Sequence, residues 1–217
     1  MNIVRLNYSE LPVAEPRICC IGNFDGVHLG HRRLFERVSE LAKEQQCLKS
    51  VITFDPTSKQ LFNPDQRVLT TLEQKTALFA QLGADEIIIL HFDEALMKTD
   101  AIDFINYLNQ FSLKKLICGF DFMFGYLGKG NVITLKEDRH VRFPVEVIEP
   151  VKYYGEKISS TRITQAIKRG EITKAEKMLG HDYNVIFDEN NVSSNVMPEV
   201  ETYRLLKASD GQFVIKQ

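Results

Sequence analysis

The residues that decide the fold are Gly22-Asn23-Phe24-Asp25-Gly26-Val27-His28-Leu29-Gly30-His31, which place two histidines between a short apolar run and a helical pattern. The apolar run at 18–21 is too short for a helix and stops at a glycine, so it predicts a fully buried strand. Apolar residues then recur at i, i+4, i+7 and i+8 over 34–42, with charged residues on the other side. That pattern predicts an amphipathic helix.

A strand, a glycine-containing turn and a helix bring backbone N–H groups and the positive end of a helix dipole to the carboxyl end of the strand. Open α/β sheets bind phosphates at this edge, so His28 and His31 indicate chemistry on an anion. The stretch lacks the GK[ST] ending of a P-loop, and its glycines are spaced four apart, unlike GxGxxG. Two histidines could also ligate zinc, but no third and fourth ligand stand at usable spacing, so no metal site is predicted.

Composition argues against several classes of partner. With 27 basic and 29 acidic residues among 217, the net charge of -2 disfavours nucleic acid or a membrane surface, and no obligatory protein partner is evident. The four cysteines lie in or beside apolar strands without CxxC spacing, which favours buried free thiols and a reducing compartment. Since the sequence has neither a long apolar run nor a signal-peptide pattern, we expect a cytoplasmic protein.

Apolar runs and amphipathic segments alternate along the rest of the chain. Thr71-Leu72-Glu73-Gln74 fits a capping box, from which a helix runs to Gly83, and Thr99 or Asp100 opens another helix. This alternation predicts a parallel sheet with right-handed crossovers and helices on both faces. The expected fold class is therefore α/β, a doubly wound five-stranded parallel sheet with strands at 18–21, 48–54, 86–90, 116–118 and 145–148.

The segment Gly119-Phe120-Asp121-Phe122-Met123-Phe124-Gly125 follows the fourth of these strands. One interpretation is a strand edge with apolar alternation. The other is an exposed aromatic loop, because glycines bracket the run and 126–130 continues it with loop residues. Beside a phosphate site, such a loop would suit a flat heteroaromatic ligand.

The segment Ile158-Ser159-Ser160-Thr161-Arg162-Ile163 leads into a helix that Gly170 closes. Hydroxyls at a helix start are commonly just N-caps. The same hydroxyls and the free N–H groups would also form a second anion cradle, with Arg162 as a permanent cation able to grip phosphate in two places.

GNFDGVHLGH resembles the HxGH signature of class I nucleotidyltransferases. In its GxFDGxHxGH form it is similar to the adenylyltransferase module of bacterial FAD synthetases, the bifunctional riboflavin kinase/FMN adenylyltransferases. Three later matches join it: Thr53-Phe54-Asp55-Pro56, the 119–125 segment with Gly130, and 158–163 as the ISSTxxR motif. The resemblance covers roughly 17–183 and implies a Rossmann-like fold and an enzyme that converts FMN and ATP into FAD and pyrophosphate.

The resemblance implies roles for individual residues. It makes His28, His31 and Arg162 catalytic, and gives Asp25 a part in ordering the turn or a metal. Implied ATP-binding residues are Gly22, Asn23, Phe24, Asp25, Gly30, Ser159, Ser160 and Thr161, and implied flavin-binding residues are Phe54, Pro56, Asp121, Phe122 and Phe124. Phe62, the one large aromatic of the loop at 57–69, is a flavin candidate by position, with loop anchoring as the alternative. Mg²⁺ would accompany ATP, and FMN and FAD would be substrate and product.

Two positions depart from the family pattern. TFxPHP reads Thr53-Phe54-Asp55-Pro56-Thr57-Ser58 here, without the histidine and second proline near the flavin. The last arginine of ISSTxxR is Thr164, which removes one positive charge and leaves Arg162 as the substitute. These departures favour an alternative, a nucleotide- or flavin-binding paralogue of low turnover that acts as a sensor or carrier. A nucleotidyltransferase for another phosphorylated acceptor is a third hypothesis.

The resemblance fades after residue 183. A riboflavin kinase domain would need a much longer tail with a glycine-rich FPTAN-like segment, so no riboflavin kinase activity is expected. Strand-like runs on either side of Ala208-Ser209-Asp210-Gly211 predict a β-hairpin instead. We therefore expect a nucleotidyltransferase domain at 1–183 and a short β appendage at 184–217, which could be a remnant of a kinase domain.

Overall fold

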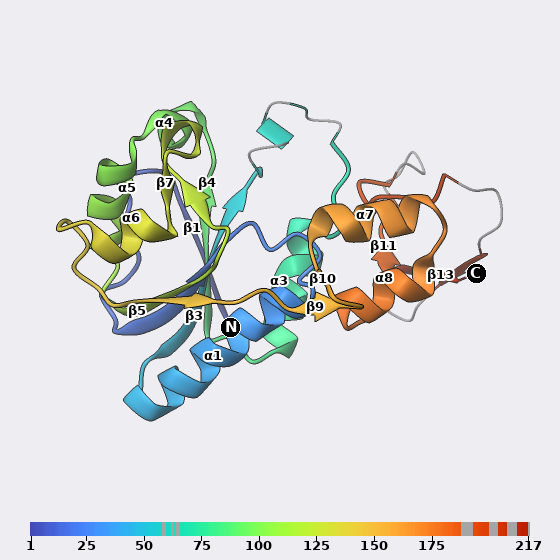
Figure 1. Cartoon of the computed structure of the whole chain (residues 1–217), viewed down its shortest axis with the longest axis horizontal. Coiled ribbons are helices and arrows are strands. Elements are labelled where there is room, and N and C mark those ends of the chain that lie inside the picture. The colour runs from blue at the N-terminus through green and yellow to red at the C-terminus, as the bar shows by residue number, and fades with distance from the viewer. Residues whose placement is uncertain are drawn as a thin grey trace. The chain divides into compact units, whose positions relative to one another are not determined.

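A computed structural model gives the fold and describes residues 1–57, 60–61, 63, 66–187, 193–199, 204–207 and 212–216 (Figure 1). Packing divides the chain into two compact units. The first unit comprises Met1–Asn23, Arg33–Pro64 and Leu78–Glu149, and the second comprises Phe24–Arg32, Asp65–Ala77 and Pro150–Gln217. The domain division at 183/184 stays a prediction.

The first unit is built on a parallel sheet with the strand order β1-β4-β3-β2-β5-β8. All the neighbouring pairs described in this sheet are parallel, so the predicted α/β fold is confirmed. The chain order reverses direction beside β2, which makes the carboxyl ends of β2 and β5 the switch point at which such sheets bind ligands. The strands are β1 (Asn2–Leu6), β2 (Arg17–Ile21), β3 (Leu48–Asp55), β4 (Glu86–His91), β5 (Leu113–Gly119) and β8 (Val145–Ile148).

β1 adds a sixth strand to the five predicted ones. It pairs with β4 at the edge of the sheet, and Leu6 is its one buried residue. An edge strand with this exposure lacks the continuous apolar run from which buried strands are predicted. The sequence pattern therefore could not distinguish β1 from a surface segment.

Alternate residues of the central strands face two helical layers. Cys19 and Ile21 of β2 belong to a hydrophobic core that α5 (Ala101–Leu108) helps to close. The residues that alternate with them point to the opposite face. Figure 1 shows α1 (Leu29–Gln45) on the other side of the sheet from α5 and α6 (Val132–Glu137). The predicted helices on both faces are therefore confirmed.

Two helices begin at the residues that the sequence predicts. The capping box before α3 (Leu72–Gln81) is formed, because the Thr71 N–H donates to Gln74 Oε1 at 2.9 Å and the Gln74 N–H donates to Thr71 Oγ1 at 3.3 Å. α5 follows Asp100, whose carboxylate accepts from the Asp103 N–H at 2.9 Å. A short helix, α4 (Glu94–Lys98), precedes it.

The segment after β5 is a small hairpin. β6 (Met123–Phe124) pairs antiparallel with β7 (Gly130–Asn131), and the 3₁₀ turn η1 (Tyr126–Gly128) joins them. Phe124 is 6% exposed, and its ring centroid lies 5.6 Å from that of Phe104. A Cβ at Gly130 would lie 2.6 Å from the Phe124 ring. The expectation of an exposed aromatic loop is therefore wrong for Phe124, because its ring belongs to the core of the first unit.

The second unit has its own hydrophobic core, which α7 (Ser160–Lys168) and α8 (Ile172–Leu179) share with small antiparallel strands. The pairing of β12 with β13 confirms the predicted hairpin, and its predicted turn at 208–211 lies outside the described residues. The strands are β9 (Lys152–Tyr153), β10 (Glu156–Lys157), β11 (Asn184–Val185), β12 (Arg204–Lys207) and β13 (Phe213–Lys216).

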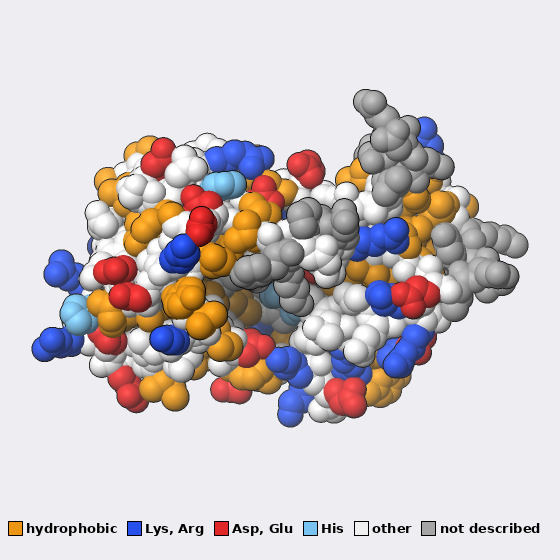
Figure 2. Space-filling model, turned by 90° about the horizontal axis from the view of Figure 1, so that it is seen from above, with side chains coloured by type: hydrophobic (Ala, Val, Ile, Leu, Met, Phe, Trp, Pro, Cys, Tyr) orange, Lys and Arg blue, Asp and Glu red, His pale blue; other side chains and the backbone are white. Residues whose placement is uncertain are grey.

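Cysteines and surface charge agree with the composition. The cysteines are free thiols; Cys19, Cys20 and Cys118 are buried as expected, whereas Cys47 is only half-buried. Burial raises the pKa of the Cys118 thiol to about 12. Basic and acidic side chains are interspersed on the face drawn in Figure 2, in keeping with the net charge of -2. None of the described helices combines the length and the apolar character that a bilayer crossing requires.

Candidate active site

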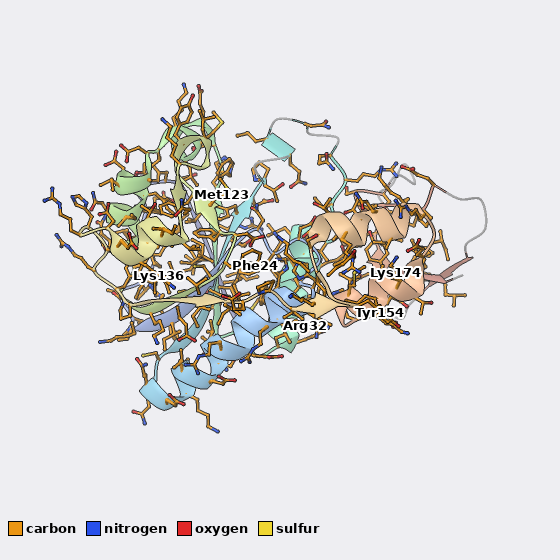
Figure 3. All side chains as sticks on the ribbon, viewed as in Figure 1. Phe24, Arg32, Met123, Lys136, Tyr154 and Lys174 are labelled. Carbon is orange, nitrogen blue, oxygen red and sulfur yellow. The ribbon has the colours of Figure 1, made fainter. Side chains whose placement is uncertain are left out.

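The turn that carries the two histidines contains positive φ angles, which residues other than glycine rarely adopt. Phe24, Gly26 and Val27 have positive φ angles of 51°, 85° and 38°. Phe24 is 1% exposed and Val27 is fully buried, so packing holds both residues in this conformation. Non-glycine residues persist there only where their surroundings over-determine them, as at active sites. Figure 3 labels Phe24 and Arg32, which bracket the turn.

Asp25 and Gly26 fasten the turn to a neighbouring segment of the second unit. Asp25 Oδ1 accepts hydrogen bonds from the backbone N–H groups of Leu69 at 2.8 Å and Thr70 at 3.1 Å. The Gly26 N–H donates to Thr70 Oγ1 at 2.9 Å. A Cβ at Gly26 would lie 2.9 Å from Leu69 Cδ1, so close packing as well as the positive φ requires glycine. The Asp25 carboxylate therefore orders the turn.

His28 acts as the N-cap of α1. Its Nδ1 accepts a hydrogen bond from the His31 N–H at 3.3 Å, and its carbonyl accepts from the Arg32 N–H at 2.9 Å. Because Nδ1 accepts, the neutral ring carries its proton on Nε2, which is then its donor nitrogen. A Cβ at Gly30 would lie 3.0 Å from His28 Cε1, which explains the glycine between the two histidines.

His31 stacks on His28, with ring centroids 3.6 Å apart and ring planes at 14°. The Phe24 ring meets His31 edge to face at 5.2 Å. His31 Nδ1 is buried and has no hydrogen-bond partner among the described residues. Burial, with the neighbouring His28 ring and the Lys75 charge, lowers the pKa of His31 well below its usual 6.5. His31 is therefore neutral at pH 7, and its enclosed nitrogen is a polar atom that a ligand can satisfy.

Lys75 is a functional candidate that sequence reasoning missed. It is 3% exposed on α3, and its charge acts on His31. A buried ammonium whose charge acts on the His31 imidazole supplies positive charge where an anion would bind. The signal in the sequence is position, because Lys75 lies one turn before the fully buried Phe79 and so occupies the apolar stripe of α3.

The start of α7 reaches the same turn. Ser159 is the N-cap, and its Oγ accepts from the Arg162 N–H at 3.3 Å, so the N-cap interpretation is confirmed. The Ser160 hydroxyl donates to the backbone carbonyl of Asp25 at 2.9 Å. Thr161 is exposed on the first turn of α7. The N-terminus of α7 is therefore joined to the turn that leads into the N-terminus of α1, and both helices have the positive end of the dipole at that end.

The Arg162 guanidinium is engaged with the β9–β10 ribbon. Nη1 donates to the carbonyl oxygens of Tyr153 and Glu156, both at 3.0 Å, and Nη2 lies 3.0 Å from Glu156 Oε2. The side chain is 19% exposed, and Cζ lies 5.8 Å from the centroid of the Tyr153 ring. The catalytic role of Arg162 stays a prediction, and a phosphate could be gripped only if the guanidinium exchanged these partners for it.

The other predicted residues belong to the first unit, where the described flavin candidates differ in exposure. Phe54 is half-buried, with its ring edge to face with Phe92 at 6.0 Å. Phe122 is also half-buried and stacks on Phe124, with ring centroids 5.7 Å apart, whereas Asp121 is exposed. Pro56 is half-buried, and Phe62 lies outside the described residues.

Gly22 and Asn23, which follow β2, also belong to the first unit. The Gly22 N–H donates to the Ile52 carbonyl at 3.1 Å, and Asn23 is exposed. The second unit thus gathers most of the nucleotide candidates: Phe24, Asp25, His28, Gly30, His31, Ser159, Ser160, Thr161 and Arg162. Among the described residues, no three or more His, Cys, Asp and Glu side chains form a group that could hold a metal ion.

Known proteins resemble this chain over most of its length. A bifunctional riboflavin kinase/FMN adenylyltransferase from Listeria monocytogenes is 33% identical over 171 residues, which cover 77% of this chain and 54% of that protein. A putative bifunctional riboflavin kinase/FMN adenylyltransferase from Geobacillus thermodenitrificans is 37% identical over 166 residues, which cover 75% and 89%. The chain spans about half the length of the curated relatives from Listeria monocytogenes and Bacillus subtilis.

A solved structure described as a macrolide-efflux protein from Streptococcus pneumoniae has a TM-score of 0.81, with 23% identity, and covers 99% of this chain and 91% of its own. At this identity the likeness shows the fold alone. The family model for FAD synthetase matches residues 11–162, a segment that contains the histidine turn and the start of α7. The chain therefore belongs to the FAD synthetase family.

Proposed function

We propose that this chain is an FMN adenylyltransferase, which transfers AMP from ATP to FMN and releases pyrophosphate. One observation carries the proposal: the stacked His28 and His31 stand at the start of α1, and the Ser160 hydroxyl joins their turn to the start of α7. The family match and the relatives named as FMN adenylyltransferases support it. The buried free thiols favour a reducing compartment, so we propose that the reaction takes place in the cytoplasm.

In the proposed reaction an oxygen of the FMN phosphate attacks the α-phosphorus of ATP. A new P–O bond forms, the bond to the oxygen that bridges the α- and β-phosphates breaks, and pyrophosphate leaves with the electron pair. A phosphomonoester has a second pKa near ~6, so the attacking group is mostly dianionic at neutral pH. No general base is required, and the protein has to align the reactants and stabilise the charge that develops.

The second unit supplies groups suited to that task. We assign the Nε2–H of His28 and the ring of His31 to the α-phosphate, because His28 Nδ1 is used as a helix cap and His31 keeps an enclosed polar atom. The N-terminus of α7, with Ser159, Ser160 and Thr161, would hold the β- and γ-phosphates. The charge of Lys75 favours an anion in this region.

The donor set of this turn suits phosphate better than a metal ion. Imidazole, hydroxyl, ammonium and backbone N–H groups donate hydrogen bonds, and Asp25 Oδ1 already accepts two of them. Mg²⁺ usually binds through one or two carboxylates, substrate phosphates and water. We therefore propose that Mg²⁺ accompanies ATP, where it would neutralise phosphate charge.

For the flavin we propose the aromatic residues of the first unit. The rings of Phe122 and Phe124 lie nearly parallel, at 19°, with Phe122 only half-buried. Such a ring offers a flat apolar face to an isoalloxazine. Phe54, Pro56, Asp121 and Phe62 complete the proposed set.

The test is incubation of the protein with ATP, Mg²⁺ and FMN, with FAD and pyrophosphate followed by chromatography. We expect both products in equal amounts. With riboflavin in place of FMN we expect no FMN, because the matched segment is the FAD synthetase model alone. Appreciable riboflavin phosphorylation would contradict that part of the proposal.

A second candidate function is a nucleotide- or flavin-binding protein of low turnover. The engagement of Arg162 with Tyr153 and Glu156 favours it, because this arginine stands in for the one that Thr164 replaces. Absence of FAD at high protein concentration, with ATP binding intact by calorimetry, would favour this function over the first.

A further inference from the structure

The C-terminal end of α8 packs on the histidine turn. Gly180 ends the helix with a φ of 76°, and its N–H donates to the Glu176 carbonyl at 2.8 Å. A Cβ at Gly180 would lie 2.5 Å from Leu29 Cδ2, and a Cβ at Gly26 would lie 3.1 Å from Leu179 Cδ2. The last residues of α8 therefore touch both the turn and the first residue of α1.

His181, the next residue, binds the turn directly. Its Nε2 lies 2.9 Å from the carbonyl oxygen of Gly26, and its Nδ1 lies 2.8 Å from the carbonyl oxygen of Asp182. Carbonyl oxygens only accept hydrogen bonds, so the ring donates to Gly26 whenever Nε2 carries a proton. Gly26 stands two residues before His28, inside the part of the turn with positive φ angles. With the proton on Nε2, this hydrogen bond holds the Gly26 peptide group two residues before His28.

Asn195 reaches the turn by a second route. The side chain is fully buried, and its Nδ2 donates to the Leu69 carbonyl at 3.2 Å and to Gln74 Oε1 at 2.7 Å. The same Leu69–Thr70 peptide group presents its N–H to Asp25 Oδ1 at 3.1 Å. Hydrogen bonds that share a peptide group polarise one another and fix its orientation. Asn195 therefore binds the same peptide group that donates to the Asp25 carboxylate, which orders the turn.

We propose that His181 and Asn195 are positioning residues for nucleotidyl transfer, because they hold the turn in the conformation that stacks His31 on His28. The inference rests on the proposed function for its activity readout and on the fold alone for its spectroscopic readout. Both residues lie beyond the segment that the family model matches, 11–162. Residues after α8 therefore take part in the site, through contacts within the second unit.

The experiment compares two variants of one position. His181→Leu removes the donor, whereas His181→Gln places an amide N–H near the position of Nε2. We expect His181→Leu to lower kcat for FAD formation by about tenfold or more, with KM for ATP nearly unchanged, and His181→Gln to recover most of that loss. His140→Leu is the matched control, because His140 is a part-exposed histidine of the first unit whose ring contacts Asp138 Oδ1 at 2.7 Å.

The second readout is the NMR spectrum of the histidine rings without substrate. We expect the ring signals of His28 and His31 to shift in His181→Leu and to stay near wild-type positions in His181→Gln and His140→Leu. Asn195→Asp, which keeps the side-chain acceptor and loses the donor, should shift the same signals. If Asn195→Asp does not fold, the two His181 variants decide the proposal.

A folded His181→Leu protein with unshifted ring signals overturns the inference, whatever its rate. Shifted signals with wild-type kcat, or equal losses of kcat in the Leu and Gln variants, overturn it as well. If the wild-type protein forms no FAD, the proposed function fails while the ring signals still decide whether His181 and Asn195 hold the turn.

Discussion

Two clusters of buried polar side chains differ in how completely their atoms are partnered. In the first unit, the fully buried Arg17 donates from Nη1 and Nη2 to the carbonyls of Phe111 and Val13, both at 2.7 Å. Its Nε makes no well-angled hydrogen bond but lies 3.1 Å from Glu86 Oε2, to which the Ser50 hydroxyl donates at 2.9 Å. In the second unit, His31 stacks on His28 and keeps a buried nitrogen without a hydrogen bond among the described residues.

This difference distinguishes buried polar side chains that stabilise the fold from buried polar side chains that could bind a ligand. Burying polar groups costs free energy unless each finds a partner, so a cluster in which each group has a hydrogen bond or an ion pair can serve the fold alone. The Arg17 cluster lies at the amino ends of β2 and β4, the opposite end of the sheet from the edge where α/β sheets bind ligands. The histidine cluster lies at the start of α1, in a turn joined to the start of α7, and among the described residues His31 Nδ1 has no hydrogen bond, so a ligand could supply its partner.

The largest effect is expected from breaking the partnered cluster. Glu86→Gln leaves the Arg17 guanidinium buried without its counter-charge, and breaking such a pair costs about 3–5 kcal/mol of unfolding free energy. Denaturant unfolding measures it. Glu94→Gln is the control, because the Glu94–Lys98 pair is exposed and its loss should leave the midpoint unchanged. A loss below about 1 kcal/mol for Glu86→Gln would show that the cluster is not a structural ion pair.

Breaking the histidine cluster should lower turnover far more than stability, although His28→Ala also removes the N-cap of α1. His28→Ala and His31→Ala should each lower FAD formation by about 10²-fold or more, since removing one preorganised donor to developing charge costs about 3 kcal/mol. Rates and thermal midpoints of both variants are the measurements. Wild-type rates in either variant would make the histidines structural and remove the contrast between the clusters.

The contrast also explains what the sequence could and could not reveal. The sheet, the capping box at Thr71 and Gln74 and the histidine turn follow from local patterns, since a short apolar run, a helix start and a glycine turn each act over a few residues. The contact of His181 with Gly26 joins residues 155 positions apart, and no periodicity carries that information.

Arg162 and Lys75 show the same limit within the site. The motif predicts a phosphate as the partner of Arg162, but the fold supplies nearby carbonyl oxygens and Glu156, which compete for the guanidinium. Lys75 lies in the apolar stripe of α3, but only the tertiary packing shows that it is buried and that its charge acts on His31. Charge type can be predicted from composition, whereas the partner of a charge depends on the tertiary fold.

A third prediction concerns Thr164, where the family pattern has an arginine that could bind phosphate. Thr164 is half-buried on α7, one turn beyond Ser160, and Arg162 is held elsewhere by Tyr153 and Glu156. A charge-assisted hydrogen bond to phosphate contributes on the order of 1.5–3 kcal/mol, so Thr164→Arg should tighten ATP binding or raise turnover by about tenfold. Gln165→Arg, exposed on the next position of the same helix, is the control for added charge alone.

Calorimetry of ATP binding and the FAD assay decide between these variants. Equal effects of Thr164→Arg and Gln165→Arg would show a general charge effect. No effect of Thr164→Arg or of Arg162→Ala on either measurement would mean that the phosphates do not bind at the start of α7.

The smallest expected effect is that of His31 on the pH dependence of stability and of ATP binding. Burial, the His28 ring and the Lys75 charge hold the pKa of folded His31 well below the usual 6.5 that the unfolded chain would show. The unfolded state therefore binds more protons as the pH falls below 6.5, so this contribution to stability is present above that pH and is lost progressively down to the folded pKa. In His31→Gln this part of the pH dependence should disappear.

ATP phosphates beside the ring should favour the imidazolium, so ATP binding below pH 6.5 should take up protons, which calorimetry in buffers of different ionisation enthalpy measures. Identical proton uptake by wild type and His31→Gln would show that the phosphates do not approach His31.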